Sequence, residues 1–424
     1  GSVVRLDILP KGLGPEGPSR VITITRNKIS LEEQAAKSEV LELELDTGSI
    51  RLGIIDIPAF YMDFEARARG DRNYRSTTRD VRKLLQELRA QNVDGVIMDL
   101  RGNGGGSLTE ATELTGLFIE TGPIVQVRSA DGRIQVERDV DPGIEYAGPM
   151  AVLVDRFSAS ASEIFAGAIQ DYRRGIILGE PTFGKGTVQN LVDLSRLDRR
   201  SNAELGQLKA TIAQFFRVAG ASTQHRGVVP DIVFPTAEFA DDFGERGLDN
   251  ALPWDQVKPA KFVPASAGLG PLTLAAGRHR QRVADDDGFA VLLEQAARVR
   301  EAQEKKELSL VEAERRAEQD RQKAEQRASE NRLRAAIGLP PLRPVSDETG
   351  ESEEEALEEA REALDEALEQ PENDLVLKEA ARILADLIAG PAVLEALIEE
   401  QPGYAAAPAA PAANDGEEAR LAAP

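Results

Sequence analysis

The sequence predicts an α/β fold in which the strands of a mainly parallel sheet alternate with helices, followed by a helical C-terminal region. Short apolar runs with the two-residue period of strands alternate with segments whose apolar residues recur every three or four positions. Repeated strand–helix–strand units form parallel sheets with right-handed crossovers. The charge also changes along the chain: residues 1–240 carry a formal charge of −4 and residues 241–424 carry −18, which predicts a boundary near residue 240.

The composition excludes several classes of function. A formal charge of −22 on 424 residues argues against nonspecific nucleic-acid binding, and no apolar run approaches the roughly 20 residues that cross a bilayer. Because the chain has no cysteine, it has no disulfide, no thiolate zinc site and no cysteine nucleophile. Its two histidines, His225 and His279, leave little material for a histidine-rich metal site. We therefore expect no cofactor, no metal, no nucleic-acid partner and no membrane span.

The first expected elements are two short paired strands at 3–9 and 21–25, where apolar and polar residues alternate around a connection rich in Gly and Pro. Such a pair has too few neighbours to form a core of its own. The α/β core follows, and its expected elements are a strand at 52–57, a helix at 76–91, a strand at 93–100, a helix at about 107–119, a strand at 150–155, a helix at about 160–172 and a strand at 176–178.

Beyond residue 240 the pattern becomes helical. A Pro-interrupted stretch with the only tryptophan, Trp254, precedes two long, highly charged helices expected at 289–337 and 351–398. The simplest interpretation of their charges is a solvated helix face. The Ala/Pro-rich segment 403–424 is expected to be disordered.

The segments around Ser160 and Lys185 are the most informative in the chain, and they allow two interpretations. In the first, Gly184 and Lys185 belong to a phosphate-binding loop, with Asp99 as a magnesium ligand. Three details disfavour it. Gly186 stands where Ser or Thr should follow the lysine, the next residues alternate like a strand where a helix is required, and the acidic strand precedes the loop.

In the second interpretation, Ser160 is a nucleophile at a strand-to-helix turn. A serine hydroxyl needs a base, and since both histidines are expected to be solvated and away from this turn, Lys185 is the available candidate. A lysine is a base only when neutral, which requires apolar surroundings that lower its pKa from about 10.4. Four apolar residues near the two motifs can supply them: Phe157, Ile164, Phe165 and Phe183. The alternative is that Ser158, Ser160 and Ser162 cap a helix, for which Ser162 is well suited.

A second unusual run extends from Asp99 to Gly106, where a strand ends in glycines before a helix. Backbone N–H groups in such a turn can point at a developing oxyanion, and glycine lets the backbone come close. The alternative, a flexible tight turn, fits the same motif.

Taken together, five motifs resemble the tail-specific, or C-terminal processing, serine proteases, and in particular the long bacterial form of that family. The motifs lie at 99–106, 158–163, 179–189, 227–231 and 250–255. The resemblance covers roughly residues 3–260 strongly and the helical remainder loosely. It implies an α/β protease core similar to those of ClpP and the crotonases, a serine endopeptidase activity and no cofactor.

The resemblance also implies roles for single residues. Ser160 is then the nucleophile, Lys185 its general base, and Gln189 the residue that orients the lysine. The backbone N–H groups of Gly106 and Ala161 form the oxyanion hole.

Asp171, eleven residues after Ser160, falls where the long form of the family has an important aspartate. On one helix the two residues are roughly 16 Å apart at about 1.5 Å per residue. Asp171 is therefore expected to support the fold near the site without touching the nucleophile.

The resemblance further implies a PDZ domain that grips substrate C-termini, a periplasmic address and an outer-membrane lipoprotein adaptor. By this resemblance the chain divides into the last PDZ strands and a connector at 1–45, a protease core at 46–240, an acidic helical domain at 241–402 and the tail at 403–424. The peptide-binding groove is then absent or incomplete. The expected substrates are polypeptides with accessible, apolar C-termini.

Two other classes of function stay open. A crotonase-like acyl enzyme would use the glycines at 104–106 to stabilise a thioester enolate, and a noncatalytic scaffold would use its acidic helices to bind a partner. Only the protease requires that a serine-reactive probe label Ser160 covalently.

Overall fold

The computed structural model describes residues 1–9, 19–27, 35–45, 48–196, 205–235, 243–265, 271–305, 307–342, 363–364, 367–368 and 370–400. The expected tail at 403–424 and much of the first half of the helix expected at 351–398 lie outside these residues. Among the helices that are described, none is long and apolar enough to cross a membrane.

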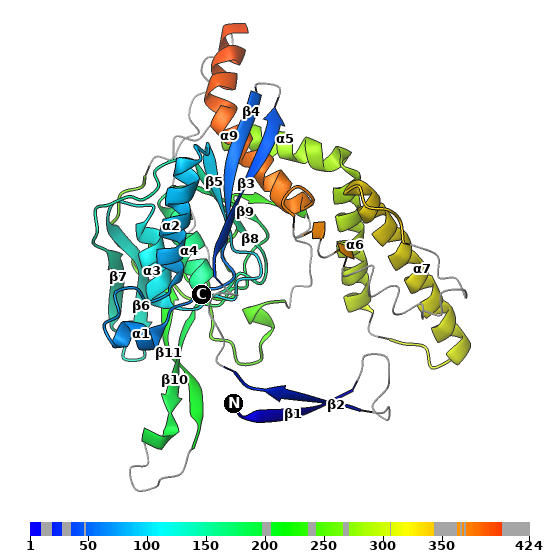
Figure 1. Ribbon diagram of the computed structural model, residues 1–424, viewed down its shortest axis with the longest axis horizontal. Helices are drawn as coiled ribbons and strands as arrows, with labels where there is room; N and C mark the ends of the chain where they lie inside the picture. The colour runs from blue at the N-terminus through cyan, green and yellow to red at the C-terminus, as the bar shows by residue number, and fades with distance from the viewer. Residues whose placement is uncertain are drawn as a thin grey trace, which may run out of the picture.

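The chain begins with a hairpin of β1 (Val3–Ile8) and β2 (Arg20–Thr25), which confirms the first two expected strands. The two strands form a sheet of their own, set apart from the rest of the chain in Figure 1. No residue of either strand is buried, and the apolar side chains of Val3, Val21 and Ile24 are exposed. As expected, this pair has no core of its own.

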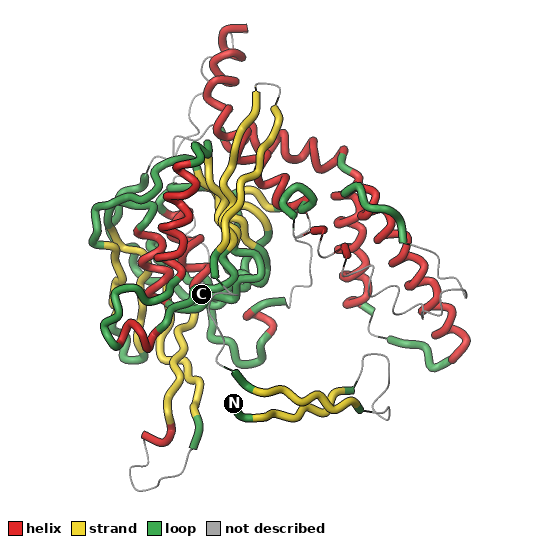
Figure 2. Tube along the Cα trace, viewed as in Figure 1, coloured by secondary structure: helices red, strands yellow, loops and turns green. Residues whose placement is uncertain are grey.

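A six-stranded sheet forms the centre of the molecule (Figures 1 and 2). Its order is β12–β9–β8–β5–β4–β3, and every neighbouring pair is parallel except β3 and β4. The strands are β3 (Lys37–Leu45), β4 (Gly48–Asp56), β5 (Gly95–Asp99), β8 (Met150–Val154), β9 (Ile176–Gly179) and β12 (Ile232–Val233). Because β3 pairs with β4 along its whole length, the boundary expected between residues 45 and 46 runs through this hairpin, and the sheet begins at Lys37.

Helices cover both faces of this sheet. On one face lie α2 (Thr77–Ala90), α3 (Leu108–Gly116) and α4 (Ala161–Asp171), close to their expected positions, and on the other lie α5 (Leu272–Asp285) and α9 (Leu375–Glu400). The strands alternate accordingly: in β5, Val96 and Met98 pack toward the first face, whereas Ile97 packs toward α9. These layers form the α/β fold that the sequence predicts.

A second, four-stranded sheet packs beside the first set of helices. It is antiparallel, with the order β10–β11–β6–β7, and consists of β6 (Gly122–Ser129), β7 (Ile134–Asp139), β10 (Thr187–Asp193) and β11 (Gln207–Phe216). Val125 and Phe215 tie this sheet to the core that contains α4. The outer parts of β10 and β11 project from the molecule as a long hairpin (Figure 1). Of its strands, only β10 is expected from the sequence.

The single helix expected at 289–337 is wrong, because this stretch forms two helices that pack against each other (Figure 1). They are α6 (Asp287–Glu304) and α7 (Glu312–Ala336). Between them, Ser309 Oγ accepts the N–H of Val311 at 3.1 Å, a local bond that competes with continuation of the helix. The short helix α1 (Phe64–Ala68) completes the α-helices described here.

Candidate active site

Ser160 is the N-cap of α4 and follows β8 by a short turn, as the sequence predicts. Its backbone has φ 57° and ψ −108°, and a positive φ is unfavourable for a residue that carries a side chain. Strain of this kind persists only where the surroundings hold it, and it is concentrated at functional sites. Ser160 is partly exposed, whereas its neighbours Ala159 and Ala161 are buried.

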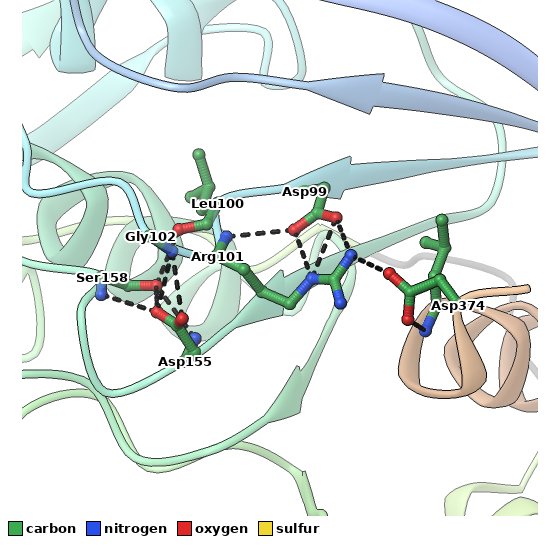
Figure 3. A network of polar contacts seen from close by, with 8 residues as sticks. Asp99, Leu100, Arg101, Gly102, Asp155, Ser158 and Asp374 are labelled. Atoms are coloured by element: carbon green, nitrogen blue, oxygen red, sulfur yellow. Dashed lines mark hydrogen bonds and ion pairs between the residues drawn. The ribbon is translucent and has the colours of Figure 1, made fainter. Parts of the chain in front are cut away.

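The turn before Ser160 is held by the carboxylate of Asp155. This carboxylate accepts the N–H groups of Phe157 at 2.9 Å and Ser158 at 3.0 Å, and across the sheet it accepts the N–H of Gly102 at 3.0 Å (Figure 3). The hydroxyl of Ser158 donates to the carbonyl of Leu100 at 2.8 Å. Ser158 therefore has a structural role, because it joins the end of β8 to the end of β5.

Asn103 makes a second connection between the same two turns. Its buried carbonyl oxygen accepts the N–H of Ala159 at 3.0 Å and the hydroxyl of Ser162 at 2.8 Å. Its side-chain amide donates to the carbonyl of Ile57 at 2.7 Å. Of the three serines that the capping alternative names, Ser160 is the N-cap, whereas Ser162 lies inside the first turn of α4, where its hydroxyl binds the neighbouring loop.

Glu163 connects Ser160 to Lys185, a role that the sequence did not reveal. This fully buried carboxylate accepts the N–H of Ser160 at 2.8 Å and the N–H of Lys185 at 3.0 Å on the same oxygen, Oε2. Its other oxygen accepts the N–H of Gly184 at 2.8 Å and the hydroxyl of Thr182 at 2.6 Å. Because both N–H groups bind the same oxygen, the backbones of Ser160 and Lys185 lie close together.

The charge state of Glu163 reflects two opposing effects. Burial raises its pKa to about 7, although the four donors around it act in the opposite direction. Four donors match the acceptor sites of an ionised carboxylate, so the hydrogen-bond pattern is that of the charged form. The available sequence signal was a glutamate three residues after a serine at a helix start, the pattern of a capping box.

Lys185 lies on the loop between β9 and β10 and is partly buried. Burial lowers the pKa of its ammonium group and the charge of Lys209 lowers it further, whereas Glu245 and Glu163 raise it. The direction is the one that a neutral lysine base requires. No hydrogen bond joins Lys185 Nζ to Ser160 Oγ in the described part of the chain.

The surroundings of Lys185 differ in part from the expectation. Ile164 and Phe165 are buried in the core, while Phe157 and Phe183 pack against Phe243, with ring centroids 5.5 and 6.2 Å apart. The loop leads into the strand β10, and not into the helix N-terminus that a phosphate-binding loop needs. This observation agrees with the case against nucleotide binding.

Residues 102–106, here called the glycine turn, lie against Ser160. A Cβ atom on Gly105 would come within 2.7 Å of the carbonyl oxygen of Ala159 and 3.0 Å of the nitrogen of Ala161. Gly106 has φ 146°, and a Cβ there would stand 2.2 Å from the carbonyl oxygen of Phe60. Within the described residues, neither Gly106 nor Ala161 has an acceptor for its N–H group, so both groups are free to bind an oxyanion.

Gln189 and Asp171 lie further from the centre. Gln189 is an exposed residue of β10, next to a register shift, and makes no described hydrogen bond to Lys185. Asp171, at the C-terminal end of α4, accepts the guanidinium of Arg217 and the N–H of Ala219, the latter at 3.1 Å. The described contacts of Asp171 therefore fix the segment that follows β11.

The expectation that both histidines are solvated is wrong. His279 of α5 is 3% exposed, its Nδ1 lies 3.0 Å from Glu379 Oε1, and its ring stacks on Phe234. The backbone N–H of His225 donates to the carbonyl of Gly184 at 2.8 Å, which places His225 beside the loop that carries Lys185. Its Nε2 is buried, with no hydrogen-bond partner among the residues described.

Comparison with known proteins shows the family of the chain. Residues 51–234 match the family model "Peptidase family S41", and residues 240–389 match "C-terminal domain of tail specific protease". The tail-specific protease of Haemophilus influenzae is 44% identical over 315 residues, which are 73% of this chain and 42% of that protein. The chloroplastic carboxyl-terminal-processing peptidase 2 of Arabidopsis thaliana is 34% identical over 55% of this chain and 41% of its own length.

This chain spans less than half the length of those two relatives. A solved structure described as a photosystem II D1 C-terminal processing protease is 28% identical, covers 55% of each chain and has a TM-score of 0.40. The two family models, matched in succession from residue 51 to residue 389, identify the family. The chain belongs to peptidase family S41, among the tail-specific, or C-terminal processing, serine proteases.

Proposed function

We propose that this chain is the catalytic part of a serine endopeptidase that cleaves polypeptides with accessible C-terminal tails, with Ser160 as nucleophile and Lys185 as general base. The observation that carries the proposal is the Glu163 carboxylate, which binds the backbone N–H groups of both residues. Of the groups near Ser160, Lys185 combines the right chemistry with a pKa lowered by burial.

The proposed reaction begins when Ser160 Oγ attacks the carbonyl carbon of the scissile peptide bond and its proton passes to neutral Lys185 Nζ. The carbonyl oxygen becomes an oxyanion, which the N–H groups of Gly106 and Ala161 bind. Collapse of this intermediate breaks the C–N bond, and Lys185 returns its proton to the leaving amine. Water then attacks the acyl-enzyme and gives a proton to Lys185. Lys185 passes this proton to Ser160 Oγ as the ester bond breaks, which releases the acid and restores the Ser160 hydroxyl.

In this proposal, Gln189 orients Lys185 and Asp171 supports the fold of α4. The hairpin β1–β2 is assigned to the end of a PDZ domain, the address to the periplasm, and the partners to substrates with apolar C-termini and an outer-membrane lipoprotein adaptor. These assignments rest on the family resemblance of the motifs.

The test compares the parent chain with Ser160→Ala and Lys185→Arg on an unfolded protein substrate. Arginine stays protonated at any working pH, so Lys185→Arg should be as inactive as Ser160→Ala while keeping a cooperative melting transition. A serine-directed fluorophosphonate probe should label Ser160 in the parent only, which separates the protease from a crotonase-like enzyme and from a scaffold. Retention of more than about one per cent of kcat/KM by Lys185→Arg, a loss of less than roughly 2.7 kcal/mol, would remove Lys185 as the base.

A further inference from the structure

Arg101, the residue before the glycine turn, is held from two sides (Figure 3). Its Nε lies 3.0 Å from both carboxylate oxygens of Asp99 at the end of β5, and its Nη2 lies 2.6 Å from Asp99 Oδ2. The same Nη2 donates to Asp374 Oδ2 at 2.6 Å. Asp374 is 273 residues away in the sequence, so this contact joins the C-terminal region to the residue before the glycine turn.

Asp374 is itself fixed by the helix that follows it. While Oδ2 accepts Arg101, Oδ1 accepts the N–H of Leu377 in the first turn of α9 at 2.9 Å. Helix α9 cannot shift freely, because Leu377, Ile383 and Leu384 are buried against the central sheet. The Asp374 carboxylate thus connects the buried part of α9 to the side chain of Arg101.

The glycine turn passes this constraint to Ser160. Directly after Arg101, Gly102 donates to Asp155, whose carboxylate also holds the turn before Ser160. Asn103 accepts the N–H of Ala159, the residue before Ser160. Arg101 thus stands at the start of a turn that is bonded to the turn of Ser160, and its position bears on how the later part of the glycine turn faces Ser160.

There is room for such a displacement. A cavity of about 220 Å³ adjoins Arg101 and is lined also by Asp155, Arg156, Phe157, Glu180 and Val376. Without Asp374, the Arg101 side chain keeps only its bonds to Asp99, and this space gives it room to turn about that single anchor. Asp374 therefore supplies the second point of attachment that fixes its position.

We propose that Asp374 is a positioning residue for the catalytic turn: through Arg101 it holds the glycine turn so that the Gly106 N–H meets the oxyanion formed at Ser160. This inference rests on the proposed function of Ser160 and Gly106. In addition to covering the sheet, the start of α9 then keeps the glycine turn in place. Misplacement by about 1 Å in such a site can cost on the order of 100-fold in rate.

The test is the substitution Asp374→Ser in the full chain. Serine is an equally good N-terminal cap, so the bond to Leu377 is kept, but its short side chain cannot reach Arg101. The matched control is Asp386→Ser on the same helix. Asp386 also pairs with arginines, at 2.6 Å with Arg278 and 2.8 Å with Arg282, but these lie on α5, away from the catalytic turns.

The readout is the rate at which a fluorophosphonate probe labels Ser160, measured against probe concentration. Asp374→Ser should lower the maximal labelling rate about 10- to 100-fold and leave the half-saturating concentration unchanged, whereas Asp386→Ser should stay within about threefold. Both variants should melt within a few degrees of each other, so a difference in labelling is not a difference in stability.

The outcomes are distinguishable. If the parent is labelled at Ser160 but Asp374→Ser reacts as fast as Asp386→Ser, the inference is wrong and the proposed function stands. If the parent is not labelled at Ser160 and Ser160→Ala still cleaves substrate, the proposed function fails and the inference fails with it. Recovery of the labelling rate in Asp374→Asn, which restores an acceptor within reach of Arg101, supports the positioning role.

Discussion

At the scale of single residues, Lys185 decides whether the proposed chemistry is possible, because a lysine accepts a proton only in its neutral form. Burial lowers its pKa, and Lys209 acts in the same direction, while Glu245 and Glu163 oppose them. Since folding shifts the equilibrium of Lys185 toward the neutral amine, the fraction of active base grows as the pH rises through the lowered pKa. Activity should therefore rise with pH on the acidic side of the profile.

Lys209 provides a test of this electrostatic argument. Lys209→Gln removes a positive charge from the neighbourhood of Lys185, which raises the pKa of Lys185 and moves the acidic limb of the kcat/KM profile to higher pH. On that limb kcat/KM should fall by a factor on the order of two or three, because Lys209 is exposed and its charge is screened by water. The measurement is a pH profile at low and at high salt, and the shift should shrink as salt is added.

The control for this charge change is Lys258→Gln, which removes an exposed lysine that does not influence the pKa of Lys185. Its profile should coincide with that of the parent. Two outcomes would contradict the assignment of the acidic limb to Lys185: a shift of the Lys209→Gln profile to lower pH, or an equal shift of the profiles of both variants.

The candidate residues could be named from the sequence, but their connections could not. Ser160 and Lys185 were chosen because the chain lacks cysteine and has two histidines. The role of Glu163 cannot be recognised from the sequence, because three of its four donors lie 19 to 22 residues further on and surround its carboxylate only in the fold. For the same reason the buried pair of His279 and Glu379, 100 residues apart, was expected to be solvated.

At the scale of elements, the prediction succeeded where the apolar residues of a segment recur with a clear period. Helix α2 shows this clearly, because Val81, Leu85 and Leu88 line its buried face at helical spacing. It failed for β7, in which only the first four residues alternate between apolar and polar side chains, too short a run to distinguish a strand. Strand β3 does alternate in sequence, but only its pairing with β4 shows that it belongs to the core.

The glycine turn gives the second prediction. In Gly106→Ala the new Cβ would stand 2.2 Å from the Phe60 carbonyl oxygen, at a φ of 146° that alanine disfavours, so the turn must shift. Loss of one oxyanion-hole donor costs about 100- to 1,000-fold in kcat, and we expect a loss of that order. The measurement is kcat and KM on one peptide substrate, with KM little changed.

Gly104→Ala, in the same turn, is the matched control. A Cβ on Gly104 would meet nothing within 4 Å, so this variant should keep kcat within a few-fold of the parent. An equal loss of kcat in both variants would mean that the turn tolerates no side chain at either position. That result would contradict a specific role of the Gly106 N–H group.

At the scale of the whole molecule, the change in charge near residue 240 predicts a boundary between two parts of the chain. In space, however, α5 and α9 lie beside the sheet (Figure 1), and their apolar residues complete the core on its second face. Ion pairs hold the two helices together, with Arg282 between Glu379 and Asp386. The protease core therefore includes chain from both sides of the boundary, a fact that composition cannot reveal.

The third prediction follows from this dependence on α9. A chain that ends at Gln370 lacks the helix and exposes the apolar face of the sheet, which Leu377, Ile383, Leu384 and Leu387 cover in the intact chain. Burial of four such side chains contributes on the order of 10 kcal/mol, as much as the whole stability of a typical domain. The shortened chain should show no cooperative thermal transition and should bind a hydrophobic dye, as measured by calorimetry and fluorescence.

A chain that ends at Glu400 keeps every described element and should melt like the parent. A cooperative transition in the chain ending at Gln370, at the same temperature as in the chain ending at Glu400, would show that the sheet does not need α9, and the second face would then need another account of its stability.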